Sequence, residues 1–173
     1  MAGLLRNLLT LMLALWRYGS LEPQSQTRVF FMVGPLDTGV ATLKSDRYLQ
    51  MAEAAQLDYV VRTGLLGHML RKGYSFVNAS QLLRFARPVR IFNRVAVASQ
   101  VVFADEKCAY FHHVFRVGTT LHAEVFVKMK FKKGRLTVNP AELLGRFGGD
   151  KPTMLQHWDE ALPDVSPHFP GTP

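Results

Sequence analysis

The stretch SDRYLQMAEAAQLDYVVRTG, residues 45–64, decides the fold because it predicts one long helix that is apolar on several sides. Ser45 suits the N-cap, Asp46 suits the positive end of the helix dipole, and Gly64 is expected to end the helix. Apolar side chains recur at helical spacing, and further apolar residues lie between them. The recurring residues are Tyr48, Met51, Ala52, Ala55 and Tyr59. We therefore expect this helix to be buried.

Strand patterns flank the helix, one before it and four after it. Turns at Asp105-Glu106 and Gly118-Thr119 are short enough to join the last three strands as antiparallel hairpins. Parallel strands would need a helix between them, and none is visible after residue 73. The order predicts an α+β hot-dog fold, in which a curled antiparallel sheet wraps around one long buried helix. The predicted strands are residues 27–33, 74–85, 94–104, 107–117 and 120–132.

The length of 173 residues suits a single folded domain. We expect the hot-dog domain at residues 27–138, after an apolar or amphipathic N-terminal helix within residues 1–20. The extension at residues 139–173 is rich in Gly and Pro and includes a short helical candidate at 141–147. This extension is predicted to be mobile or to lie along the surface, outside the core.

Residues 1–17, MAGLLRNLLTLMLALWR, have too short an apolar run for the roughly 20 residues of a spanning helix. In a helix, one narrow polar stripe would hold Arg6, Asn7, Thr10, Ala14 and Arg17. Three interpretations stay open: an interfacial membrane helix, a helix packed on the domain or a partner, and a signal peptide. The expected location is cytoplasmic, with a peripheral position at the inner face of a membrane as the alternative.

The formal net charge of +8 favours an anionic partner. No nucleic-acid-binding motif accompanies the charge, so we expect no nucleic-acid partner. Cys108 is the only cysteine, which excludes an internal disulfide and a multi-thiolate zinc site. His112 and His113 are adjacent in a strand and point to opposite faces, so they cannot chelate one metal ion together. Neither a metal nor a cofactor is expected.

Two stretches carry a resemblance to a known family. Residues 45–66 and residues 80–134, which include an Arg-Pro-Val bend at 87–89, resemble the hot-dog acyl-CoA thioesterases of the 4-hydroxybenzoyl-CoA type. The resemblance covers about residues 27–133. It implies a homodimer or homotetramer in which the sheets of two protomers join and an acyl-CoA site lies at the protomer boundary.

In that family an acidic residue lies ten positions before a helix tyrosine and is often followed by a His-x-Asn-Asn stretch. Here the tyrosine is Tyr48, Thr38 lies ten positions back, and the acid Asp37 lies eleven back. Residues 42–45 read Thr-Leu-Lys-Ser in place of His-x-Asn-Asn. The resemblance therefore implies Asp37, with Thr38 beside it, as the catalytic position. A carboxylate there would attack a thioester carbonyl or activate water, whereas an Asp-Thr-Gly sequence also suits a simple turn.

Other polar residues are candidates for binding substrate. Backbone N–H groups at the helix start would stabilise an oxyanion. Polar residues on the strand at 74–85 would line a substrate channel or form a hydrogen bond at a dimer boundary. Arginines near Pro88 would meet coenzyme A phosphates or stay solvated. The substrate-binding candidates are Ser45, Asp46, Arg47, Tyr48, Asn78, Ser80 and Arg87, the last together with Arg84 and Arg90.

The sequence thus predicts an acyl-CoA thioesterase that releases a free acid and coenzyme A. The alternative is a non-catalytic acyl-binding or lipid-binding protein docked on a membrane, which the altered loop motif favours. Glu53 within the helix is a weaker candidate acid, since a helix glutamate is ordinary when solvated. A hydratase on the same fold would need an Asp-x4-His signature, which is missing because Thr42 stands five positions after Asp37.

Overall fold

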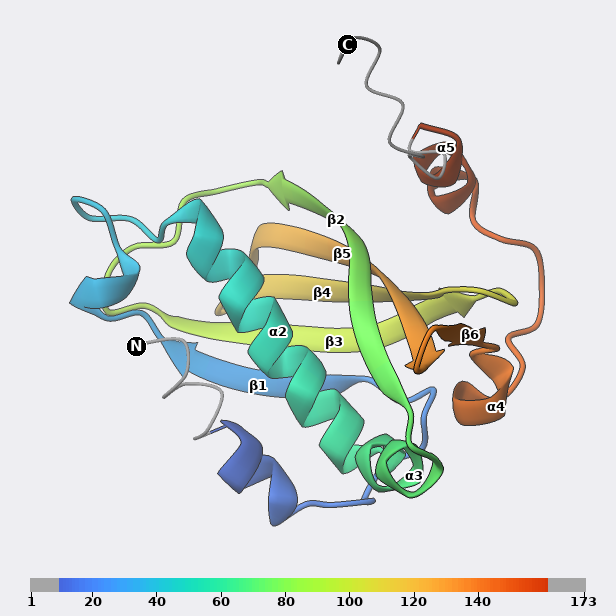
Figure 1. Cartoon of the computed structure of the whole chain (residues 1–173). Helices are drawn as coiled ribbons and strands as arrows, with labels where there is room; N and C mark the ends of the chain where they lie inside the picture. The colour runs from blue at the N-terminus through green and yellow to red at the C-terminus, as the bar shows by residue number, and fades with distance from the viewer. Residues whose placement is uncertain (1–9, 162–173) are drawn as a thin grey trace, which may run out of the picture.

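The computed structural model describes residues 10–161 and shows an antiparallel sheet curled around one long helix (Figure 1). The strand order is β1-β3-β4-β5-β2, and a short β6 pairs with the end of β5. The predicted α+β hot-dog fold is confirmed. The strands are β1 (Thr27–Met32), β2 (Ser75–Phe85), β3 (Arg94–Ala104), β4 (Ala109–Val117), β5 (Thr120–Lys133) and β6 (Leu136–Val138).

Helix α2 (Ser45–Arg62) lies across the concave face of the sheet and contacts β1, β3 and β5 (Figure 1). Its small side chains let it approach the sheet closely, and two tyrosines pack on aromatic rings of β4. The Tyr48 ring centroid lies 5.4 Å from that of Phe115, and the Tyr59 centroid lies 5.1 Å from that of Phe111. The residues expected on its buried side are all buried: Tyr48, Met51, Ala52, Ala55 and Tyr59.

The ends of α2 are formed differently from one another. The prediction that Ser45 caps the helix is wrong, because Lys44 is the N-cap residue and Ser45 is already helical. Lys44 makes no side-chain capping hydrogen bond. Gly64 has a left-handed φ of 72° and ends the helix region as predicted, before the short helix α3 (Leu65–Lys72) begins.

The described part of the C-terminal extension, residues 139–161, lies against the domain. Its helix α5 (Thr153–Ala161) is absent from the sequence prediction. Leu155 and Trp158 of α5 are buried in a small cluster with Cys108 and Tyr110, on the sheet face opposite α2. The preceding helix α4 (Ala141–Leu144) adds two leucines to the main core. Within the described residues 139–161 the extension lies on the domain, and the expectation that it stays outside the core is wrong for Leu143 and Leu144.

The N-terminal segment is attached to the C-terminal half of α2. Residues 10–15 are helical, and the backbone N–H of Gly19 donates to Val61 O at 3.4 Å. Leu21 N–H donates to Arg62 O at 3.1 Å, and the Tyr59 hydroxyl donates to Pro23 O. The segment is therefore packed on the domain. Arg6 and Asn7 of the predicted polar stripe lie outside the described residues. Across residues 10–161, none of the helices combines the length and apolar character that a bilayer crossing requires.

Candidate functional site

Three segments meet at the N-terminal end of α2. The loop after β1 reaches the start of the helix, where Lys44 N–H donates to Asp37 O at 3.0 Å. The bend between β2 and β3 joins them, because Leu43 N–H donates to Val89 O at 2.8 Å. An isolated bridge between Thr42 and Arg90 continues this pairing. Loop, helix start and bend thus form one hydrogen-bonded unit.

A cavity of about 300 Å³ lies within this unit. Its wall is mostly apolar, and its polar side chains come from the first turn of α2 and from the bend. The lining residues are Leu43, Ser45, Tyr48, Phe85, Ala86, Arg87 and Pro88. Three of the predicted substrate-binding residues, Ser45, Tyr48 and Arg87, are therefore brought together around one space.

Tyr48 fixes the bend against the helix. Its hydroxyl accepts a hydrogen bond from Val89 N–H at 3.4 Å, and its ring lies edge-on to Phe85 with centroids 5.1 Å apart. Burial raises the pKa of Tyr48, although the Val89 N–H partly opposes the shift. The residue is a neutral phenol at physiological pH that shapes the cavity wall.

The first turn of α2 provides backbone donors. Since no side chain caps the helix, its first N–H groups keep no partner within the helix and carry the positive end of its dipole. Arg47 N–H bends back to Lys44 O at 3.0 Å, so the amides of Ser45 and Asp46 are the first donors of the helix. The side chains of Asp46 and Arg47 pair with each other, with Arg47 Nε 3.6 Å from Asp46 Oδ2.

Asp37 and Thr38 are both buried beside the helix start, but neither lines the cavity. Asp37 lies in a short 3-10 turn (Pro35–Asp37), where its Oδ2 accepts Gly34 N–H at 3.1 Å. Thr38 Oγ1 donates to Pro35 O at 3.1 Å. The carboxylate thus stabilises the turn, while its main chain contacts the N-cap of α2.

Asn78 and Ser80 lie elsewhere, at a β-bulge of β2, and they do not line the cavity. Asn78 Oδ1 accepts a hydrogen bond from Gln56 Nε2 at 3.3 Å, and Gln56 also approaches Met129 Sδ at 2.9 Å. Gln56 is buried in the middle of α2, and the sequence interpretation missed it. The signal available was an amide on an otherwise apolar side of the helix.

A serine and a histidine form a second polar pair in the core. Ser99 Oγ and His113 Nδ1 are 2.7 Å apart, and both residues are fully buried. Burial lowers the pKa of His113 to about 3, with the neighbouring His112 adding to the effect, so the imidazole is neutral. His112 instead approaches Glu124 Oε1 at 3.1 Å, which confirms that the two histidines point to opposite faces.

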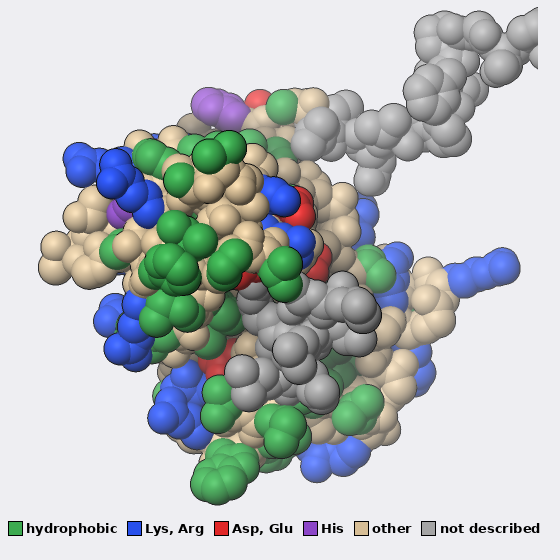
Figure 2. Space-filling model, turned by 90° about the vertical axis from the view of Figure 1, so that its left-hand side faces the viewer, with side chains coloured by type: hydrophobic (Ala, Val, Ile, Leu, Met, Phe, Trp, Pro, Cys, Tyr) green, Lys and Arg blue, Asp and Glu red, His purple; other side chains and the backbone are tan. Residues whose placement is uncertain are grey.

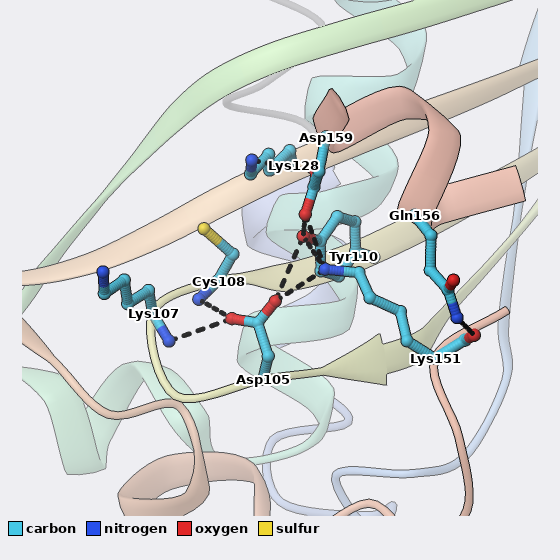
Figure 3. Close-up of polar contacts among 8 residues, drawn as sticks. All are labelled: Asp105, Lys107, Cys108, Tyr110, Lys128, Lys151, Gln156 and Asp159. Atoms are coloured by element: carbon cyan, nitrogen blue, oxygen red, sulfur yellow. Dashed lines mark hydrogen bonds and ion pairs between the residues drawn. The ribbon is translucent and has the colours of Figure 1, made fainter. Parts of the chain in front are cut away.

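A group of charged side chains lies beneath α5 (Figure 3). Lys151 Nζ donates to Asp105 Oδ2 at 2.8 Å, to Tyr110 Oη at 2.6 Å and to Asp159 Oδ2 at 2.6 Å. Tyr110 also donates to Asp159 at 2.6 Å, and Lys128 Nζ donates to Asp159 Oδ1 at 2.9 Å. These ammonium and carboxylate groups satisfy one another, so the group attaches α5 to the sheet. Within residues 10–161 no cluster of His, Cys, Asp and Glu could hold a metal ion.

Comparisons with known proteins identify the family and the fold. The family model of the thioesterase-like superfamily matches residues 35–147. A probable thioesterase from Escherichia coli is 17% identical with a TM-score of 0.63, and the match covers 69% of this chain and 96% of the Escherichia coli chain. A probable thioesterase from Bartonella henselae is 15% identical with a TM-score of 0.59, and the match covers 66% of this chain and 98% of that one. A mutant 4-hydroxybenzoyl CoA thioesterase complexed with 4-hydroxybenzoyl CoA is 12% identical with a TM-score of 0.62, and the match covers 68% of this chain and 95% of that one. No curated protein sequence matches this one. At these identities the solved structures show the shared fold alone.

Proposed function

We propose that this chain, which belongs to the thioesterase-like superfamily, hydrolyses an acyl-CoA thioester to a free acid and coenzyme A. The observation that carries the proposal is the cavity at the uncapped first turn of α2, beside the buried Asp37 loop. It combines an apolar wall for an acyl group with backbone donors at one end. A thioester carbonyl needs that combination.

In the proposed reaction, the carbonyl oxygen lies against the amides of Ser45 and Asp46. Water or the Asp37 carboxylate attacks the carbonyl carbon, the C–S bond breaks, and coenzyme A leaves as a thiolate that takes its proton from the water consumed in the reaction. Each oxyanion donor would contribute about 3 kcal/mol to the stabilisation of the transition state. If water attacks, Asp37 takes its proton; if Asp37 attacks, water then hydrolyses the resulting anhydride. Thr38 is the second candidate at this position.

Binding is assigned to the walls of the same cavity. Leu43, Phe85 and Pro88 would contact the acyl group, and Arg87 at the rim would meet a phosphate of coenzyme A. Asn78 and Ser80 lie on β2 and would act at the protomer boundary.

An acyl-binding protein without hydrolytic activity is the second candidate. It is favoured by the position of Asp37, whose carboxylate accepts the Gly34 amide and does not line the cavity. On this alternative the acid only stabilises its turn, and the cavity binds an acyl group without reacting with it.

Thiol release from short-chain, long-chain and aromatic acyl-CoAs separates the two candidates. Wild type should release thiol, and Asp37→Asn should lower kcat by at least a hundredfold, in the range typical of losing a general base. Asp37→Asn keeps an acceptor for Gly34 N–H, so the turn should survive. Thr38→Val tests the neighbouring position, and Glu106→Gln, at an exposed acid in a distant turn, is the control. Binding of acyl-CoA without thiol release by wild type would favour the second candidate.

We also propose that two or four copies assemble through β2. This strand ends the sheet, and its side chains Val77, Leu82 and Phe85 are between 43% and 52% exposed. Pairing of two β2 strands would join the sheets and place the cavity near a protomer boundary. Light scattering during gel filtration should give twice or four times the mass of one chain, and a monomer would contradict this assembly. Contact of residues 1–17 with a membrane surface is likewise proposed.

A further inference from the structure

The helix at residues 10–15 packs on the domain with its polar side. Thr10 and Ala14, both members of the polar stripe, are 6% and 0% exposed. The apolar side faces outward: Met12, Leu13 and Trp16 are 58%, 64% and 94% exposed. A helix at the surface of a globular protein normally buries its apolar side. The outer side of this helix is therefore available to another apolar medium.

The neighbouring strand extends this surface. Phe30 and Met32 of β1 are 50% and 62% exposed, and the guanidinium of Arg94 lies 4.2 Å from the centroid of the Phe30 ring. Figure 2 shows hydrophobic side chains interspersed with Lys and Arg on this side of the molecule. Main-chain hydrogen bonds of Gly19 and Leu21 to the end of α2 hold the segment in place, so the surface is preformed.

A cavity of about 340 Å³ lies beneath Trp16, between the N-terminal helix, the edge of β1 and the outer side of α2. Three arginines from three separate segments and a single carboxylate, that of Asp58, line this cavity. Arg62 forms an ion pair with Asp58 at 3.3 Å, so the remaining charge of the cavity is positive. The lining residues are Leu13, Trp16, Arg17, Arg28, Val29, Phe30, Asp58 and Arg62.

We propose that this surface docks on a bilayer of anionic phospholipid and that the arginine-lined cavity binds a lipid phosphate. Trp16 and Leu13 would enter the interfacial region of the bilayer, where tryptophan is favoured. Arg17 and Arg28 would meet the phosphate as charge-assisted donors. The proposal adds a site to the chain and does not depend on thioester hydrolysis.

A second copy of this chain fits the surface poorly. In a two-fold contact the same patch would face itself, so the arginines of one protomer would meet those of its partner. Like charges placed opposite one another disfavour such a contact. An anionic bilayer instead offers negative charge at its surface, which matches the arginines, and an apolar interior, which matches the apolar side chains.

Flotation of the full chain with vesicles tests the proposal. The protein should float with vesicles of equal parts phosphatidylglycerol and phosphatidylcholine and remain below with phosphatidylcholine alone. Arg28→Glu and Trp16→Ser should each weaken binding to the anionic vesicles about tenfold. The controls are Arg135→Glu, which makes the same charge reversal, and Leu136→Ser, which also replaces an exposed apolar side chain by serine; both residues lie on the distant β5–β6 hairpin.

Several results would overturn the proposal. Equal flotation with both vesicle types, or an equal effect of Arg28→Glu and Arg135→Glu, would remove the phosphate site. An absence of flotation by wild type would refute the docking as a whole. If Trp16→Ser instead converted an oligomer into a smaller species in the absence of vesicles, a second copy would be the occupant of the surface. None of these results depends on thiol release, so they are independent of the proposed activity.

Discussion

Replacing Lys151 with Met should detach helix α5 before the rest of the protein unfolds. The ammonium group of Lys151 is the one cation shared by Asp105, Tyr110 and Asp159 in the group beneath α5 (Figure 3). Burial alone would lower the pKa of Lys151, but the hydrogen bonds to the two carboxylates outweigh it and raise the pKa. Methionine keeps the length and the apolar stem of the side chain and removes the charge.

The expected cost follows from the exposure of Lys151 and its two carboxylate partners. A hydrogen bond to a charged group contributes about 1.5–3 kcal/mol, and breaking a fully buried ion pair costs about 3–5 kcal/mol. The side chains of Lys151, Asp159 and Asp105 are 19%, 28% and 33% exposed, so water screens part of the loss. Lys128 still pairs with Asp159 after the replacement. We expect the contact of α5 with the sheet to weaken by about 2 kcal/mol.

The two tryptophans make this loss measurable. Trp158 is 7% exposed within α5, whereas Trp16 is 94% exposed in the N-terminal segment. In a Trp16→Phe background the emission of Trp158 therefore reports the contact of α5 alone. Urea titration should show the Trp158 transition about 1 M below its wild-type midpoint, while circular dichroism of the sheet changes little. Lys107→Met is the control, since this exposed lysine borders the same group and its side chain points away (Figure 3).

Two outcomes would refute this reasoning. If the Trp158 midpoint stayed within about 0.2 M of wild type, a fifth of the expected shift, the ammonium would contribute little to the position of α5. If Lys107→Met lowered the Trp158 midpoint equally, the loss of one positive charge would explain the effect, and the specific contacts of Lys151 would not be its cause.

Acid should release the same helix. Burial alone would raise the pKa of Asp159, but hydrogen bonds from Lys151, Tyr110 and Lys128 outweigh it and lower the pKa to about 2. The stabilisation by the ionised carboxylate is therefore complete above about pH 4, the pKa in the unfolded chain, and is lost as the pH falls through about 2. The Trp158 emission should shift to the red over that range, and an unchanged spectrum at pH 2 would contradict it. Gln56→Leu should cost about 1–2 kcal/mol in urea unfolding, because it removes a buried amide and its hydrogen bond to the part-buried oxygen of Asn78, whereas Gln50→Leu on the same helix should cost less than half as much. In Gly67→Ala the new Cβ would lie 2.0 Å from the Tyr18 hydroxyl and displace that ring, so hydrogen exchange of the Gly19 amide should accelerate. The gain in helix propensity should keep the free energy of unfolding within about 1 kcal/mol of wild type. Slow exchange at Gly19 would argue against the clash.

The fold could be read from the sequence because its main signals are periodic and local. The buried side of α2 follows a helical repeat, and the β3 to β5 meander is divided by turns at Asp105-Glu106 and Gly118-Thr119, where the structure places them. Helix α5 escaped prediction because its buried side is small, and its partners Cys108 and Tyr110 lie more than 40 residues earlier in the chain. A contact at that sequence separation leaves no local pattern.

The candidate site was predictable only in part, for a related reason. Ser45, Tyr48 and Arg87 could be singled out by their positions at a helix start and at a bend, and they do line one cavity. Asp37 could be singled out only by its distance from Tyr48, and spacing along the chain does not define where a side chain points. Its carboxylate meets the Gly34 amide three residues away, a contact typical of an Asp in a turn.

The two proposed sites lie at different points along helix α2, so the helix sets the distance between them. At a rise of 1.5 Å per residue, Ser45 at the acyl cavity and Asp58 at the phosphate cavity lie about 20 Å apart along the helix axis. An interfacial helix buries its apolar side only about 5–10 Å deep, so docking through Trp16 and Leu13 would leave the acyl cavity outside the lipid. An acyl-CoA would then reach the cavity from the aqueous side. Membrane binding would in that case concentrate the protein beside the bilayer without placing its acyl cavity in the lipid phase.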